Sequence, residues 1–443
     1  GRARQPAQAR PRRHLTLPAP DRPLPLSRRP RLLLRIDRLA GIPACWLLTR
    51  LRRLGLGGGP PASTAPPPGR ILFIKLAEQG STVLAYDALA EAVRRVGRER
   101  VHFAAFAENR FILDVLGLLP PENVVTVDTR SLGALLRTGW GALRRIRALR
   151  CDATIDMEFF ARSSALLAFL SGAPHRVGFH TYFDEGPYRG DLLTHRVMYN
   201  PHLHTSETFL SLVHALDFPP ATFPTFNFRP PPPLALPQFA PTAAETERVR
   251  ALVEAAAGGS GGPLVLLNAN CSDMLPLRRW PAENYVALAR RLVASDSTLI
   301  VGFTGSPEEA ARVGELAAAV GSPRAVSLAG RTSLRELLVL FGQAELLITN
   351  DSGPAHFAAL TPVDVIALFG PETPRLFAAR GPRSHPLSAQ VACSPCVNAF
   401  NNRQSACRDN ICMQRVTVDR VFGAAAEILV ARQRRLKTAT VSE

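Results

Sequence analysis

The sequence lacks any apolar run of the roughly 18 residues that a membrane-spanning helix needs. Residues 41–49 are apolar, but this stretch is too short and Pro43 interrupts it. No apolar core followed by a small-residue cleavage site comes after the basic N-terminal residues, so we expect no signal peptide. These absences predict a cytoplasmic body and exclude an integral membrane protein built on such helices.

Acidic residues are scarce in the first part of the chain. Residues 1–60 hold 14 Arg and only two Asp, so +12 of the formal net charge of +17 falls there and the remainder carries +5. This asymmetry argues against a basic globular nucleic-acid-binding domain and favours a basic arm. We therefore expect no nucleic-acid partner.

Aromatic residues are also few, at 7% of the chain, whereas 46% of the 443 residues are apolar. Ala, Leu and Val supply most of that apolar content, which suits α/β packing. The length leaves room for two or three domains, and the sequence shows no internal repeat of 20–50 residues.

Residues 31–54 combine Leu, Ile and Trp46 with Arg at near-helical spacing. Such a helix could lie on an anionic membrane surface with its Arg side chains toward the lipid headgroups. The alternative is an ordinary basic amphipathic helix that packs on the protein. A Gly/Pro-rich linker, residues 57–69, follows it.

Short apolar runs alternate with helical patterns from Arg70 onward, which predicts parallel sheets with helices on both faces. A Pro-rich stretch separates two such series. The sequence therefore predicts five regions: a basic Pro/Arg-rich arm with linker (1–69), a first Rossmann-like domain (70–217), an interdomain linker region (218–262), a second Rossmann-like domain (263–425), and a C-terminal helix end and tail (426–443).

The most informative segment is residues 346–371, LLITNDSGPAHFAALTPVDVIALFGP. It reads as a strand, a small-residue loop at Asp351, Ser352 and Gly353, a helix containing His356, and a second strand. Free backbone N–H groups at such a loop favour an anion such as phosphate. The alternative is that Asp351 and Ser352 only cap a helix.

This segment resembles the C-terminal signature of the ADP-heptose:lipopolysaccharide heptosyltransferases, glycosyltransferase family 9, which have the GT-B architecture of two facing Rossmann-like domains. Other segments resemble family motifs in the family's order: RILFIK (70–75), the aspartate-led strand and serine-bearing helix (155–179), the basic-Trp-Pro element (277–289) and LAGRTSLRELL (328–338). The resemblance covers roughly residues 70–425. It implies that the first domain binds a lipid-linked glycan acceptor, that the second binds a nucleotide-sugar donor, and that transfer needs no catalytic metal. It also implies that the final helix, from about residue 418, returns to the first domain.

The resemblance also implies donor-binding residues in the second domain. It assigns Asp351, Ser352, Gly353 and His356 to the donor's diphosphate and sugar. Further candidates are Arg278 and Arg279 for the phosphates, Asn268 and Thr304 for lining the pocket, and Glu308 or Glu309 for the ribose hydroxyls. The alternatives are a solvated Arg pair and glutamates that favour a helix start.

The first domain departs from the family pattern at the expected catalytic base. The family carries Gly-Asp after its first-strand Lys, whereas this chain has Lys75, Gly80 and then Ser81. A serine hydroxyl cannot serve alone as a base near neutral pH, so we assign that role to Glu78, three residues earlier. A different base, or a protein that has lost transfer activity, are the alternatives.

Asp156, Arg162 and Arg176 are candidates for binding an anionic acceptor. The alternative is that Asp156 caps a turn and the arginines are surface groups.

Four of the seven cysteines, Cys393, Cys396, Cys407 and Cys412, form the pattern C-x2-C-x10-C-x4-C. Thiols at these spacings could hold a structural zinc ion, remain free, or form disulfides. Disulfides are disfavoured in a cytosolic protein.

The sequence thus predicts an inverting glycosyltransferase that moves a heptose-like sugar from an ADP-linked donor to a lipopolysaccharide-type acceptor, peripheral on the inner face of the cytoplasmic membrane. Two other functions stay open: a GT-B transferase for another sugar and acceptor, and a non-catalytic nucleotide-sugar-binding protein at the membrane.

Overall fold

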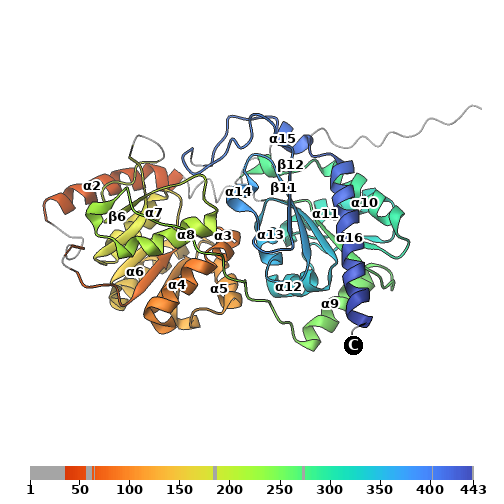
Figure 1. Cartoon of the computed structure of the whole chain (residues 1–443), viewed down its shortest axis with the longest axis horizontal. Helices are drawn as coiled ribbons and strands as arrows, with labels where there is room; N and C mark the ends of the chain where they lie inside the picture. The colour runs from red at the N-terminus through yellow and green to blue at the C-terminus, as the bar shows by residue number, and fades with distance from the viewer. Residues whose placement is uncertain are drawn as a thin grey trace, which may run out of the picture.

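The computed structural model describes residues 35–55, 62–63, 65–182, 187–271, 275–401 and 403–441, with the side chains of 436–441 excepted. Two α/β lobes lie side by side (Figure 1). Each contains one six-stranded, all-parallel sheet, as the alternating pattern predicted.

The first sheet has the strand order β3-β2-β1-β4-β5-β6. Its strands are β1 (Ile71–Ile74), β2 (Val101–Phe106), β3 (Val124–Val127), β4 (Ala153–Asp156), β5 (His175–His180) and β6 (His195–Met198). The helices of this lobe are α2 (Gly41–Arg53), α3 (Gln79–Leu84), α4 (Tyr86–Val96), α5 (Arg110–Leu116), α6 (Leu132–Leu149), α7 (Arg162–Leu170) and α8 (Thr205–His214). Strands β1 and β4 are buried at every position, because helices cover both faces of the sheet.

The second sheet has the order β12-β11-β10-β7-β8-β9. Its strands are β7 (Leu264–Asn268), β8 (Ile300–Phe303), β9 (Ala325–Ser327), β10 (Leu346–Asn350), β11 (Asp364–Phe369) and β12 (Ser384–Ser388). Its helices are α9 (Ala243–Ala256), α10 (Ala282–Ser295), α11 (Ala310–Val320), α12 (Leu334–Gln343), α13 (Gly353–Ala358), α14 (Pro374–Phe377), α15 (Ile411–Gln414) and α16 (Val418–Val441).

Two expected boundaries differ from the structure. Helix α9 lies within the predicted linker region, but Val249 and Val253 bury their side chains in the core of the second lobe against α12. The extended connection therefore ends near Thr242, which caps α9 through a hydrogen bond to the amide of Glu245.

Helix α16 does not return to the first lobe, contrary to expectation. Its Val421 and Ala425 belong to the second lobe's core, and it packs on α10, β10 and β11 (Figure 1). Within the described residues, no helix is both long enough and apolar enough to cross a bilayer.

The loop between β12 and α15, residues 389–410, reaches the first lobe instead, and we call it the crossing loop. Ala399 is buried within the first lobe's core, and the ring of Phe400 lies 6.0 Å from that of Phe160 and 5.3 Å from that of Tyr199. The crossing loop, which follows the last strand of the second lobe, therefore packs into the core of the first lobe.

Candidate functional site

The carboxyl end of β1 places a buried lysine next to the seam between the lobes. The fully buried Lys75 ammonium donates to the carbonyl of Ala77 at 2.7 Å and to Glu158 Oε2 at 3.1 Å. Glu158 also accepts the amides of Leu76 (2.7 Å) and Ala77 (3.0 Å). Burial lowers the pKa of Lys75, and the adjacent Glu158 opposes that shift. Lys75 and Glu158 thus fix the backbone that leads into the next loop.

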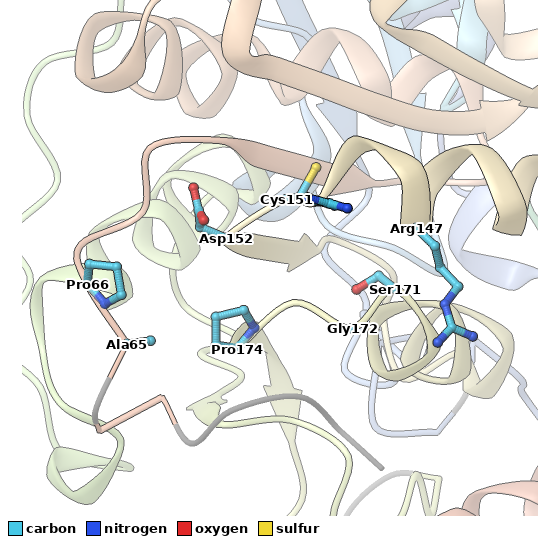
Figure 2. A pocket seen from close by; sticks show the side chains of 9 residues that line it. Ala65, Pro66, Arg147, Cys151, Asp152, Ser171, Gly172 and Pro174 are labelled. Atoms are coloured by element: carbon cyan, nitrogen blue, oxygen red, sulfur yellow. The ribbon is translucent and has the colours of Figure 1, made fainter.

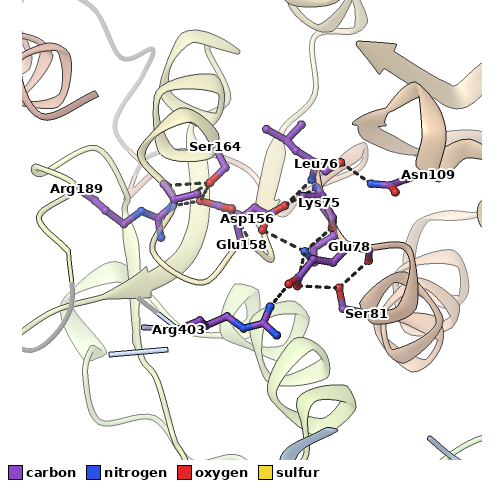
Figure 3. A network of polar contacts seen from close by, with 12 residues as sticks. Lys75, Leu76, Glu78, Ser81, Asn109, Asp156, Glu158, Ser164, Arg189 and Arg403 are labelled. Atoms are coloured by element: carbon purple, nitrogen blue, oxygen red, sulfur yellow. Dashed lines mark hydrogen bonds and ion pairs between the residues drawn. The ribbon is translucent and has the colours of Figure 1, made fainter. Parts of the chain in front are cut away.

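Glu78 lies on that loop in a left-handed backbone conformation, with φ of 67°. Its carboxylate forms an ion pair with Arg403 and lies 3.7 Å from the Lys75 ammonium (Figure 3). The Ser81 hydroxyl donates to the Glu78 carbonyl at 2.8 Å and lies 3.5 Å from Glu78 Oε2. The structure therefore brings together Lys75, Glu78 and Ser81, the three residues assigned to catalysis from the sequence.

The two lobes touch at Gly80. A Cβ atom at this position would lie 2.7 Å from the His356 ring and 3.1 Å from the Cα of Gly353. Helix α3 of the first lobe therefore packs directly on the D-S-G loop and helix α13 of the second. Burial lowers the pKa of His356 to about 3, so its ring is neutral near pH 7.

Behind this contact the second lobe holds two buried carboxyl groups and one arginine. Arg278 Nη1 lies 3.3 Å from Glu372 and 3.8 Å from Asp351. Burial raises the pKa of both carboxyl groups, whereas Arg278 lowers it. His356 Nδ1 is buried without a hydrogen-bond partner among the described residues, whereas Asp351 has its ion pair with Arg278 and the neighbouring Glu372 carboxyl. One polar atom of the predicted donor site is thus left without a partner.

Arg403 joins the lobes and was not predicted from the sequence. The crossing loop carries it, and its guanidinium binds Glu372 at 2.9 Å as well as Glu78. Burial lowers the pKa of Arg403 to about 10, which leaves it charged at neutral pH. Glu372 was also missed, although a carboxylate directly after Gly370-Pro371, at the carboxyl end of β11, was a usable signal.

The neighbouring Trp280 fixes the basic element that carries Arg278 and Arg279. The Trp280 amide donates to Asn350 Oδ1 at 2.9 Å, and its indole donates to the carbonyl of Val416 at 2.7 Å. The Arg279 carbonyl accepts from Asn410 at 2.9 Å. Of the two arginines predicted to bind the phosphates, Arg278 is the one that forms an ion pair with Asp351.

The remaining predicted donor residues follow β7 and β8. Asn268 donates to the Thr304 hydroxyl at 3.2 Å, and both side chains are buried. Glu309 accepts the amide of Ser306 at 2.8 Å in a capping box, which is the helix-start role left open above. Glu308 is exposed on the same turn, and hydrogen bonds to its own backbone and to Ser306 lower its pKa.

Asp156 has internal partners at the end of β4. It is fully buried, forms an ion pair with Arg189, and accepts from the Ser164 hydroxyl at 2.9 Å and the Glu158 amide at 3.0 Å. Burial raises the pKa of Asp156, and Arg189 is the largest opposing influence. Figure 3 shows Asp156 between Ser164 and Arg189, behind the loop that carries Glu78.

The two predicted acceptor arginines are engaged elsewhere. Arg176 lies near the amino end of β5, where its guanidinium donates to the carbonyls of Leu192 (2.7 Å) and Ala173 (2.6 Å). Arg162 donates to the carbonyl of Tyr188 at 2.9 Å and pairs with Asp37 at 3.2 Å. Ligands of such sheets bind at the carboxyl edge, so we do not retain Arg176 as an acceptor-binding residue.

All seven cysteines are free thiols. Over the ranges that the structure describes, no group of three or more His, Cys, Asp or Glu side chains is arranged to hold a metal ion. Cys393 and Cys407 are exposed, whereas Cys412 is buried, and burial raises its pKa to about 11. The predicted zinc clip is therefore not formed here, and neither is a disulfide; free thiols are the form that the structure shows.

A cavity of about 500 Å³ lies away from the seam (Figure 2). It is lined by Ala65, Pro66, Arg147, Arg150, Cys151, Asp152, Ser171, Gly172 and Pro174. Cys151 and Asp152 precede β4, so this cavity is at the amino edge of the first sheet. Lys75 and Glu158 follow the opposite edge, so the cavity is separate from the seam site.

Two facing Rossmann-like lobes, each with a parallel six-stranded sheet, define the GT-B class of fold. The family model described as "Glycosyltransferase family 9 (heptosyltransferase)" matches residues 140–406. The chain therefore belongs to glycosyltransferase family 9.

Curated relatives match over shorter segments. Lipopolysaccharide heptosyltransferase 2 of Salmonella typhimurium is 32% identical over 102 residues, which is 22% of this chain and 29% of that protein. Lipooligosaccharide heptosyltransferase 2 of Campylobacter jejuni is 25% identical over 158 residues, 34% of this chain and 47% of that protein. The chain thus matches less than half the length of these two relatives.

Solved structures match over most of the fold. The E. coli ADP-heptose lps heptosyltransferase II has a TM-score of 0.60 at 20% identity, over 82% of this chain and 99% of that one. The E. coli heptosyltransferase WaaC with ADP has a TM-score of 0.54 at 17% identity, over 81% of this chain and 99% of that one. These similarities confirm the predicted two-lobed architecture.

Proposed function

We propose that the chain is an inverting glycosyltransferase that moves a heptose-like sugar from ADP onto a lipopolysaccharide-type or other cell-envelope glycan, at the inner face of the cytoplasmic membrane. Family membership and the names of the relatives support this class of reaction. The observation that carries the proposal is the seam itself. A carboxylate from the first lobe, Glu78, lies opposite the donor loop and two arginines from the second.

The second lobe holds the donor in this proposal. Arg278 and Arg403 bind the diphosphate, because a planar guanidinium can donate to two phosphate oxygens at once. Asp351 accepts from a sugar hydroxyl, and neutral His356 supplies a further polar contact. The unpartnered His356 Nδ1 supports this assignment, since buried polar atoms in folded proteins are rarely left without partners.

The first lobe supplies the base. The acceptor oxygen attacks the anomeric carbon as its proton passes to Glu78, and the bond from that carbon to the diphosphate oxygen breaks. The electron pair leaves with ADP, whose added charge Arg278 and Arg403 stabilise, so we include no metal ion. Glu78 is engaged by Arg403 in the ligand-free protein. The donor diphosphate competes for that arginine and so frees the base.

An ADP-release assay tests this proposal. Protein supplied with ADP-heptose and a deacylated lipopolysaccharide core acceptor should release ADP. Glu78→Gln should lower kcat by about 100-fold or more, because a general base contributes at that level. The exposed Glu122→Gln serves as the matched control and should change nothing. No turnover with any of several nucleotide sugars, under conditions in which a family 9 enzyme is active, would contradict transfer.

A non-catalytic nucleotide-sugar-binding protein is the second candidate. Ser81 at the family's Asp position and the ion pair that occupies Glu78 both favour it. Isothermal titration with ADP separates the two functions. The second candidate is supported if Arg278→Ala weakens ADP binding, Glu78→Gln leaves the affinity for ADP unchanged, and no turnover is observed.

A further inference from the structure

Helix α6 exposes an apolar stripe. Leu132, Leu136 and Trp140 recur every four residues, and their side chains are 54%, 67% and 64% exposed. Ala142 and Ile146 face inward to the core of the first lobe. Residues four apart lie above one another on a helix, so the three exposed side chains form a continuous line.

The segment around helix α2 repeats this arrangement. Leu39 and Trp46 are 73% and 53% exposed, as are Leu47 (52%) and Leu54 (73%). The opposite side of the helix buries Cys45, which packs with α7. The guanidinium of Arg50 lies 5.3 Å from the centre of the Trp46 ring. An amphipathic helix thus presents aromatic and cationic groups together, away from the protein.

Helix α7 joins these two elements into one layer. Its Leu166 and Leu170 pack beside Leu48 of α2, and its Leu167 and Ala168 belong to the cluster that holds Ile146 of α6. The connections β3-α6-β4 and β4-α7-β5 join parallel strands, and right-handed crossovers in the same direction across the sheet put both helices on the same side. We call the outer surface of α6, α7 and α2 the helical face; Figure 1 shows these helices on the first lobe.

Arginines outnumber acidic residues on and beside the helical face, where Asp37, Asp128 and Asp191 pair with Arg162, Arg130 and Arg52. Residues 129–151 contain six Arg, residues 38–55 contain four, and neither segment contains Asp or Glu. Helix α7 has no acidic residue either. By contrast, α4 contains Asp87 and Glu91, and α8 contains Glu207. The three helices of this face therefore lack the acidic residues that α4 and α8 carry on the same lobe.

Tryptophan shows the same bias. Of the three Trp in the chain, Trp280 is buried in the second lobe, whereas Trp46 and Trp140 are exposed on the helical face. Trp is enriched where a protein meets the boundary between lipid headgroups and hydrocarbon, and Arg beside it binds anionic headgroups. Exposed apolar side chains among an excess of arginines match an anionic lipid surface in both chemistry and charge.

We propose that the helical face docks on an anionic lipid bilayer, with α6 and α2 both in the membrane interface. The α2 segment supplies one short apolar stripe. Helix α6 adds a second stripe, which was not predicted from the sequence. Docking through two helices also fixes the orientation of the first lobe against the bilayer. This proposal is independent of the transfer reaction.

Vesicle binding of the full chain tests the proposal. Phosphatidylcholine vesicles with phosphatidylglycerol should sediment the protein, and phosphatidylcholine alone should not. Leu136→Ser/Trp140→Ser on α6 and Trp46→Ser/Leu47→Ser on α2 should each weaken binding by about tenfold or more, because each removes two apolar side chains that docking buries in the bilayer. The matched control is Val430→Ser, an exposed apolar residue of α16 that is 47% exposed. Circular dichroism melts verify that each variant folds.

Tryptophan fluorescence provides a second measurement that does not depend on sedimentation. Anionic vesicles should shift the emission to shorter wavelength, and Trp46→Phe and Trp140→Phe should each remove part of that shift. Trp280 contributes a constant signal because it is already buried. A full shift in Trp140→Phe, or unchanged vesicle binding in the α6 double variant, overturns the proposal. So does equal binding to neutral vesicles, or a dimer in ultracentrifugation that only the α6 and α2 variants abolish.

Discussion

Gly80 is the residue at which the two lobes come closest. An added methyl group would meet the His356 ring at 2.7 Å and the Gly353 backbone at 3.1 Å, so the lobes must separate to accept it. We predict that Gly80→Ala lowers kcat by about 10- to 100-fold, because small misplacements of reacting groups have effects of that size. Steady-state kinetics checks this expectation. Gly314→Ala, whose added Cβ would meet nothing within 4 Å, should be neutral.

His102 should make the protein sensitive to acid. Burial, followed by Arg70 and Arg145, lowers its pKa from the ordinary 6.5 to about 4, and neither ring nitrogen has a hydrogen-bond partner. As the pH drops from about 6.5 to 4, the unfolded chain binds a proton at His102 before the folded protein does. The free energy of unfolding therefore falls over this pH range.

We accordingly predict that His102→Leu raises the free energy of unfolding at pH 5, relative to pH 8, by about 1–2 kcal/mol. Urea unfolding at the two pH values measures this difference. The exposed His202→Leu is the control and should leave the pH dependence unchanged. An equal pH dependence in His102→Leu and the parent protein would contradict the assignment.

The candidate site was predictable where its parts are local in sequence. One segment after β1 carries Lys75, Glu78 and Ser81, and the donor loop is likewise one continuous segment. Each of these two groups could therefore be predicted from neighbouring positions in the sequence. Glu372 and Arg403 required tertiary structure, because an arginine in a long loop gives no signal of the lobe that it will reach. The surroundings of Arg176 also required tertiary structure, because the sequence does not reveal that its guanidinium would donate to backbone carbonyls.

Among the structural elements, helix α7 depends on a residue from another helix. Its own N-cap, Ala161, has no side-chain acceptor, and Asp37 accepts the amides of Arg162 (3.0 Å) and Ser163 (2.8 Å) in its place. We predict that Asp37→Ala lowers the free energy of unfolding by about 1 kcal/mol, the usual effect of losing a cap. It should also speed proteolysis before residue 55, measured by mass spectrometry. Asp419→Ala, an exposed acidic residue, is the control.

Alternation of apolar runs and helical patterns was enough to predict the central strands, since these are buried on both faces. The edge strands β3 and β9 were predicted as well, but the edge strands β6 and β12 were not. Strand β12 contains Pro386, which an edge position tolerates, and β6 alternates buried and less buried residues over only four positions. Helix α9 was hidden by the prolines that precede it, so composition assigned it to the linker.

At the scale of the whole molecule, a buried ion pair holds the lobes together beside the linker. Asp87 of α4 lies 2.8 Å from Arg380 of the second lobe and accepts the amide of Leu234 at 3.2 Å. We predict that Asp87→Ala lowers the free energy of unfolding by about 3 kcal/mol, because a buried guanidinium loses its counter-ion. Thermal melts test this, with the exposed Asp114→Ala as control. A smaller loss in Asp87→Ala/Arg380→Ala would confirm that the unpaired charge is the cause.

The crossing loop gives the molecule a built-in limit on how quickly it can exchange ligands. Phe400 is inserted beside Phe160 and Tyr199 while its own chain is rooted in the other lobe. Any wide separation of the lobes must therefore withdraw an aromatic ring into water, at about 2 kcal/mol. For the proposed reaction we therefore predict that Phe400→Ala speeds product release, which pre-steady-state kinetics measures.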